Sequence, residues 1–128
     1  MRKRKTNQIL GELEAVIMEI VWKFKSASVR EVLDNLKKRR KVAYTTVMTV
    51  MARLADKGIL NRKLDKSGAY VYVPSQDKET FLAASSRKLI KNLIDEFGEV
   101  AVAQFIDAVS DSNQKDLAQW QKKLKKIR

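Results

Sequence analysis

The spacing of apolar residues changes once within the first 74 residues, and this change constrains the fold more than any other feature. Three segments carry apolar residues at three- and four-residue steps, which is typical of amphipathic helices. After Gly58 follow two short runs rich in β-branched and aromatic residues, which are typical of strands and end at Pro74. The sequence therefore predicts three helices followed by a β-hairpin.

The ends of these helices have recognisable signals. Ser28 and Glu31 have the spacing of a capping box at the start of the second helix, and Gly58 is a usual helix stop after the third. The expected ranges are 11–25, 28 to about 39, and 42 to about 57. The first helix should bury a stripe made of Leu13, Ile17, Ile20, Val21 and Phe24.

The chain after Pro74 is predicted to be helical again. A long helix should end at Gly98, a short one should follow from Val100 to Val109, and a last one should run from Leu117 to Ile127. So many apolar residues exceed what a small neighbouring domain can cover, and pairing with a second copy solves this problem. The predicted dimerisation residues are Leu89, Leu93, Phe97, Phe105, Leu117, Trp120, Leu124 and Ile127. An intramolecular helical bundle is the alternative.

Charge and composition indicate a polyanionic partner. The formal net charge is +12, and residues 1–74 hold 17 Lys and Arg against 7 Asp and Glu. Solubility alone is the alternative explanation for this excess. The chain has no cysteine or histidine and no Gly-rich phosphate loop, so metal sites of the Cys/His type and histidine catalysis are excluded, and we expect neither an enzyme nor a cofactor.

Two pairs of carboxylates, Asp95 with Glu96 and Asp107 with Asp111, are the candidates for an enzymatic site, but such pairs usually belong to a solvated surface. No apolar run has the length of a membrane span or of a signal peptide. We therefore expect a cytoplasmic protein that does not insert into a membrane.

The third predicted helix has an outer face without charge. Eleven consecutive residues from Val42 to Ala52 are uncharged, although KKRRK at 37–41 directly precedes them. One stripe, Val47 to Leu54, is apolar, and the opposite side carries Thr45, Thr46 and Thr49. Short hydroxyl and methyl groups can approach base edges in the major groove while nearby cations hold phosphates. A helix buried on all sides is the alternative.

The order of helices and hairpin predicts a winged helix-turn-helix over residues 1–74, in which the third helix enters the major groove, followed by a helical dimerisation domain over residues 75–128. The predicted DNA contacts are Lys41, Tyr44, Thr45, Thr46, Met48, Thr49, Arg53, Arg62, Lys63 and Lys66. A nucleoid-type protein that coats DNA without specificity is the alternative, but Lys and Arg should then occupy the outer helix face.

Three segments resemble the penicillinase-repressor family of bacterial transcription regulators, the BlaI/MecI/CopY group: LGELEAVIMEIVW (10–22), VAYTTVMTVMARLADKGIL (42–60) and AYVYVP (69–74). The resemblance implies a homodimer with an N-terminal winged helix that represses promoters by binding inverted-repeat operators. It also implies that the threonines of the third helix and the hairpin cations are the positions to test for DNA contact.

Two departures from the family limit this comparison. The copper-responsive branch ends in a cysteine-rich motif, which this chain lacks. The β-lactam branch, which acts in antibiotic resistance, is regulated by a membrane sensor-protease pathway that leads to cleavage of an Asn-Phe bond. The corresponding pair here is Gln104 and Phe105, within VAVAQFIDAV.

Overall fold

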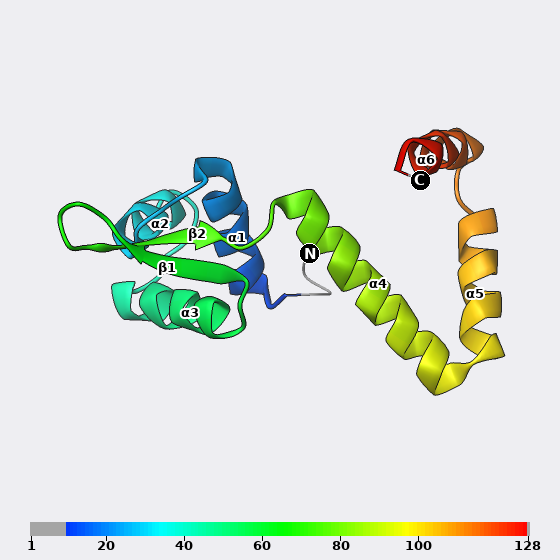
Figure 1. The fold of residues 1–128 in the computed structure, drawn as a ribbon, viewed down its shortest axis with the longest axis horizontal. Coiled ribbons are helices and arrows are strands. Elements are labelled where there is room, and N and C mark those ends of the chain that lie inside the picture. Colours follow the sequence, from blue (N-terminus) through cyan, green and yellow to red (C-terminus); the bar gives the residue numbers. More distant parts are fainter. Residues whose placement is uncertain (1–9, 128) are drawn as a thin grey trace. The chain divides into compact units, whose positions relative to one another are not determined.

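The computed structural model describes residues 10–127 and consists mostly of helices, with one antiparallel hairpin. The elements are α1 (Glu12–Phe24), α2 (Val29–Leu36), α3 (Tyr44–Asp56), β1 (Leu60–Leu64), β2 (Tyr70–Pro74), α4 (Lys78–Phe97), α5 (Glu99–Ser110) and α6 (Gln114–Ile127) (Figure 1). The predicted fold class, three helices and a hairpin followed by further helices, is confirmed. Among the described helices, none combines the length and apolar content that crossing a bilayer requires.

The second helix begins as predicted but ends earlier. The Ser28 hydroxyl accepts a hydrogen bond from the Glu31 amide at 3.1 Å, and the Glu31 carboxylate accepts one from the Ser28 amide at 2.9 Å. The expected extension to Arg39 is wrong, because α2 ends at Leu36 and a turn follows. Leu36 is the last buried residue before α3, and the five basic residues that follow it, at 37–41, would repel one another along a helix.

The connection from α3 to β1 depends on Gly58. This residue has φ +79°, and its amide donates to the Ala55 carbonyl at 3.0 Å. The next amide, that of Ile59, donates to the Leu54 carbonyl at 2.9 Å. Glycine reaches this left-handed conformation without steric cost, so the chain can reverse directly into the strand.

The hairpin pairs Leu60 with Pro74 at its base and Leu64 with Tyr70 beside the turn. A third backbone segment joins it, because Ala27 and Tyr72 exchange two hydrogen bonds of 3.0 and 2.8 Å. The sequence pattern did not predict this bridge, since Ala27 lies between two serines that look like a simple break. The bridge attaches the hairpin to the segment between α1 and α2.

The core of the first compact unit, which extends to Ser85, lies among α1, α2, α3 and the hairpin. Its largest fully buried side chains include Ile17, Met18, Leu36, Met51, Leu54 and Leu60. Phe24 was expected in this core, but it is 40% exposed because α1 ends there and Lys25 turns the chain away with φ +68°.

The start of α4 belongs to the first unit, since the Phe81 ring packs on Trp22 with centroids 5.5 Å apart. The predicted boundary after Pro74, between a DNA-binding domain and a dimerisation domain, concerns what the two parts do and stays a prediction.

The second unit runs from Ser86 and comprises the rest of α4 with α5 and α6. Gly98, with φ +60°, separates α4 from α5 at the predicted position. Within the described residues 86–126 of this unit, no side chain is buried. Its apolar residues therefore lack a core within the single chain.

Candidate nucleic-acid interface

The outer face of α3 is open to solvent, as an interface with DNA requires. Thr45, Thr46 and Thr49 are exposed, whereas Val47, Val50, Met51 and Leu54 on the opposite side are buried. A helix buried on all sides is therefore excluded. Figure 1 shows α3 beside β1, with its first residues at the same end of the unit as the hairpin tip.

The Thr49 hydroxyl has a defined hydrogen-bonding state. It donates to the Thr45 carbonyl one helical turn earlier, at 2.8 Å. Because a hydroxyl has one hydrogen, the oxygen of Thr49 is left with acceptor capacity only. On this face it can therefore accept a hydrogen bond from an amino group, and its methyl group can contact a thymine methyl.

The first turn of α3 is suited to a phosphate group. Ala43 occupies the N-cap and supplies no side-chain hydrogen bond, so amides of the first turn remain without a side-chain acceptor. Lys41 and Thr46 line a shallow pocket of about 390 Å³ at this end, together with Arg40 and Glu12, which form an ion pair with each other. An uncapped helix start beside a lysine attracts an anion through its dipole and its charge.

Arg30 is a candidate that the sequence pattern did not reveal. Its guanidinium carbon lies 5.0 Å from the centroid of the Tyr44 ring, so an exposed residue of α2 covers the first residue of α3. The stacking holds Tyr44, which is 41% exposed, beside the threonine face. Periodicity could not show it, because the contact joins residues 14 positions apart in different helices. Met48, also exposed at 42%, extends the same face with a flexible apolar side chain.

The hairpin tip presents its cations on a fixed turn. The Asp65 carboxylate accepts hydrogen bonds from the Ser67 hydroxyl at 2.6 Å, the Ser67 amide at 2.8 Å and the Ala69 amide at 3.0 Å. The Ser67 hydroxyl is the main reason that the pKa of Asp65 lies below its usual value, with the Ala69 amide next. The carboxylate therefore stays ionised and bound to the turn, while Lys66 remains exposed.

Ion pairs separate the basic residues into two groups. Arg40 pairs with Glu12 at 3.3 Å, and Lys57 pairs with Glu14 at 2.9 Å. Within residues 10–127, no carboxylate forms an ion pair with the cations predicted to contact DNA, which are Lys41, Arg53, Arg62, Lys63 and Lys66. Arg62 instead lies 5.1 Å from the ring centroid of Tyr70. No direct ion pair therefore competes with an outside polyanion for these cations.

Comparison with known proteins identifies the family of the chain. The model of the family described as penicillinase repressor matches residues 10–126. The chain belongs to the penicillinase repressor family. This family consists of transcriptional regulators rather than enzymes, and the resemblance stated from the sequence is confirmed.

Individual relatives are similar over a shorter range. A protein named transcriptional regulator BlaI from Mycobacterium tuberculosis (strain CDC 1551 / Oshkosh) is 41% identical over 71 residues, which cover 54% of this chain and 51% of that protein. A penicillinase repressor from Bacillus licheniformis is 29% identical over 82 residues, which cover 63% of this chain and 62% of that protein. The chain thus spans between half and two thirds of the length of these relatives.

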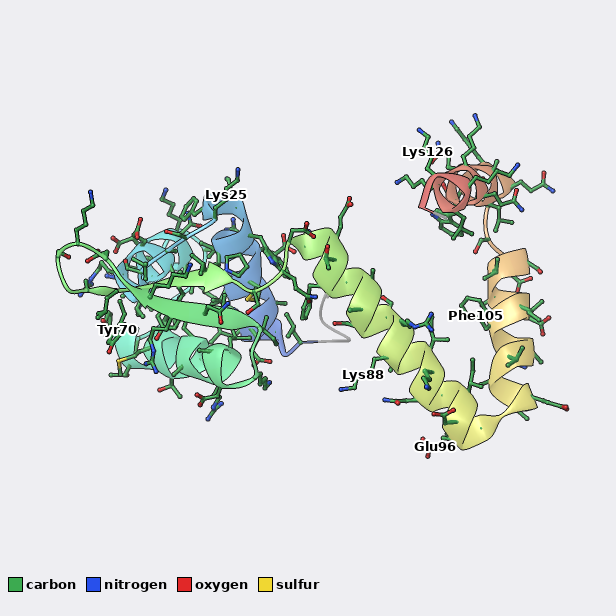
Figure 2. The ribbon with its side chains drawn as sticks, viewed as in Figure 1. Lys25, Tyr70, Lys88, Glu96, Phe105 and Lys126 are labelled. Carbon is green, nitrogen blue, oxygen red and sulfur yellow. The ribbon has the colours of Figure 1, made fainter. Side chains whose placement is uncertain are left out.

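The residues predicted for dimerisation and cleavage lie on the helices of the second unit. Their exposed fractions are 46% for Leu89, 43% for Leu93, 55% for Phe97, 53% for Phe105, 48% for Trp120 and 51% for Leu124. Leu117 is half-buried, and the side chain of Ile127 lies outside the described residues. Gln104 and Phe105 are consecutive exposed residues within α5, where Phe105 stands out from the helix (Figure 2). The second unit therefore offers an extensive apolar surface.

Proposed function

We propose that this protein is a sequence-specific transcriptional repressor that binds an inverted-repeat DNA operator as a homodimer. The observation that carries the proposal is the exposed, uncharged face of α3 formed by Thr45, Thr46 and Thr49, next to cations that form no ion pair within residues 10–127. The names of the relatives, a transcriptional regulator and a penicillinase repressor, support it. Such a protein acts in the cytoplasm, where the chromosome is.

In this proposal the two kinds of side chain have different tasks. The face of α3 enters the major groove, where Thr49 offers an acceptor and a methyl group to base edges. Lys41, Arg53 and the hairpin cations contact phosphates, which fix the position of the helix without reading sequence. The rigid turn around Asp65 supports this division, because a fixed hairpin tip keeps Lys66 at one place along the backbone.

The apolar surface of the second unit supports the homodimer. Six of the predicted residues are at least 43% exposed in the single chain. Burying about 2,000 Å² of mostly apolar surface between two copies gives a gross gain of tens of kcal/mol, at roughly 25 cal/mol per Å², before ordering costs. Two linked copies present two α3 helices, so two half-sites that are each read weakly combine into one specific operator.

Selection of bound sequences from a random DNA library tests the proposal. The full chain should enrich one motif that occurs as an inverted repeat. Lys66→Ala should weaken binding to the selected operator and to unrelated DNA alike, and it should reduce the salt dependence of binding. Binding without any enriched motif would mean that the protein coats DNA in the manner of a nucleoid protein, and the repressor proposal would then fail.

Sedimentation tests the homodimer separately. Trp120→Asp places a charge on the exposed apolar surface and should yield monomers at micromolar concentration. Gln121→Asp introduces the same charge at the neighbouring exposed position of α6 and should leave the dimer intact. A dimer that persists equally in both variants would show that the surface around Trp120 is not the interface.

Relief of repression completes the proposal. A membrane sensor-protease pathway would lead to cleavage of the bond between Gln104 and Phe105, which would remove α6 from the chain and weaken the dimer. The exposure of both residues supports access, although α5 must unwind locally before a protease can bind the bond. Mass spectrometry of the protein after induction in its native cells tests this step: intact chain under full derepression would exclude it.

A further inference from the structure

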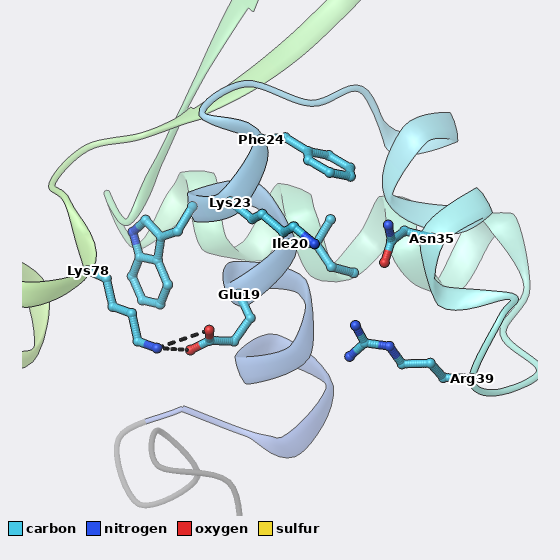
Figure 3. Close-up of a pocket in the computed structure, with 8 residues that line it drawn as sticks. Glu19, Ile20, Lys23, Phe24, Asn35, Arg39 and Lys78 are labelled. Carbon is cyan, nitrogen blue, oxygen red and sulfur yellow. Dashed lines mark hydrogen bonds and ion pairs between the residues drawn. The ribbon is translucent and has the colours of Figure 1, made fainter.

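A second pocket lies on the first unit, outside the interface proposed for DNA. It has a volume of about 610 Å³, within the range of small-molecule sites. The residues around it come from α1, from α2 and the turn after it, and from the start of α4 (Figure 3). They are Glu19, Ile20, Trp22, Lys23, Phe24, Asn35, Arg39 and Lys78. No residue of α3 or of the hairpin lines it, so the proposed DNA contacts leave it unused.

One side of the pocket is apolar and firmly held. The Trp22 indole nitrogen donates to the Gln76 carbonyl at 3.0 Å, and its ring packs on buried Phe81. Ile20 is buried beneath the pocket, whereas Phe24 leaves 40% of its surface in water. A flat apolar group placed against Phe24 would remove this surface from water, and no ordering of the indole would be needed.

The charged side chains around the pocket determine whether it favours an anionic or a cationic ligand. Glu19 is neutralised by Lys78, whose ammonium lies 2.9 and 3.0 Å from its two carboxylate oxygens. Lys23 and Arg39 form no ion pair with any carboxylate within residues 10–127. Figure 3 shows them approaching the same space from α1 and from the turn after α2, with Asn35 beside them. Two uncompensated cations next to an apolar wall favour an anion with an apolar body.

We propose that this pocket binds a small organic carboxylate with a flat apolar body. The ring lies against Phe24 and Ile20, and the carboxylate binds the guanidinium of Arg39 and the ammonium of Lys23. Arginine is suited to this contact because its planar donors match a carboxylate in pairs. The inference is independent of DNA binding, since it uses none of the residues assigned to that interface.

Nuclear magnetic resonance of the full chain tests the pocket with 3-phenylpropanoate as the probe. The chain has two tryptophans, and Trp120→Phe assigns the indole N–H signal of Trp22, which lies in the pocket wall. Titration should shift the Trp22 signal with saturation in the millimolar range. The neutral analogue 3-phenylpropanamide should produce a clearly weaker response, because it lacks the charge that Lys23 and Arg39 recognise.

Two pairs of variants distinguish specific binding of the carboxylate in the pocket from non-specific attraction to the basic surface. Arg39→Ala and Lys23→Ala should each weaken binding of 3-phenylpropanoate by about tenfold, as expected for a lost hydrogen bond to a charged group. Lys38→Ala and Lys25→Ala remove neighbouring exposed charges that do not line the pocket and should leave binding unchanged. The proposal is overturned by an unsaturated shift, by an equal response to the amide, or by equal losses in the pocket variants and their controls.

Discussion

Substitutions of Thr49 separate the two contacts that its side chain offers to DNA. Because its hydroxyl donates to the Thr45 carbonyl, the oxygen can only accept a hydrogen bond from a base. Thr49→Val keeps the shape and the methyl group but replaces the hydroxyl, and with it this acceptor, by a second methyl group, while Thr49→Ser keeps the acceptor and removes the methyl group. The Thr45 carbonyl loses no essential partner, since it also belongs to the backbone hydrogen bonds of α3.

The expected magnitudes follow from these two contacts. One neutral hydrogen bond contributes about 1 kcal/mol, so Thr49→Val should cost about 2 kcal/mol in a dimer, or roughly 30-fold in affinity. The methyl group contributes about 0.8 kcal/mol per subunit when buried, so Thr49→Ser should cost roughly tenfold or slightly more. Neither variant changes a charge, so the salt dependence should stay that of the wild type.

Fluorescence anisotropy titrations measure these effects on the selected operator and on an unrelated duplex at one salt concentration. Both variants should bind the unrelated duplex as the wild type does. Wild-type affinity of both variants for the operator would mean that Thr49 reads no base. Equal losses on both duplexes would mean that the substitutions disturb α3 itself.

Two further predictions concern the scaffold that holds α3. Leu54→Ala removes a fully buried side chain and should lower the free energy of unfolding of the first unit by about 3 kcal/mol, measured by urea titration of Trp22 fluorescence in a Trp120→Phe background; a loss below about 1 kcal/mol would contradict the packing. For Glu14, burial raises the pKa, but hydrogen bonds from Lys57 and the Gly11 amide outweigh it and leave the pKa below its usual value. The lowered pKa means that Glu14 stabilises the fold above its unfolded-state pKa and loses this contribution as the pH falls through the folded-state pKa. Glu14→Gln should therefore be less stable than the wild type at neutral pH, by up to about 1 kcal/mol because Lys57 is 55% exposed, and equally stable in acid; a difference that persists in acid would contradict the ion pair.

Much of the fold follows from local patterns in the sequence. The helix period, the capping box at Ser28 and the glycine stops at Gly58 and Gly98 are decided by neighbouring residues, and each is present as predicted. The buried stripe of α3 also follows from its period, because the outward threonines and the inward aliphatic residues differ so clearly. Local chemistry was sufficient at these positions.

Features that depend on distant partners could not be predicted. The stacking of Arg30 on Tyr44 and the bridge between Ala27 and Tyr72 join segments whose approach is set by the packed core. Phe24 fits the apolar stripe of α1, yet it lies at the last residue of the helix, where the chain turns away and leaves it half in water. The ion pairs that occupy Arg40 and Lys57 also lie outside any local pattern.

Site-specific cross-linking measures directly whether the threonine face of α3 lies in the major groove. Because the chain has no cysteine, Thr49→Cys introduces a single thiol. The operator is prepared with a thiol tether on a cytosine amino group in the major groove, or on a guanine amino group in the minor groove. A disulfide should form with the major-groove tether within each half-site, and Lys88→Cys on α4 should form none there. Cross-linking of Thr49→Cys only to the minor-groove tether, or to neither, would contradict base reading by this face.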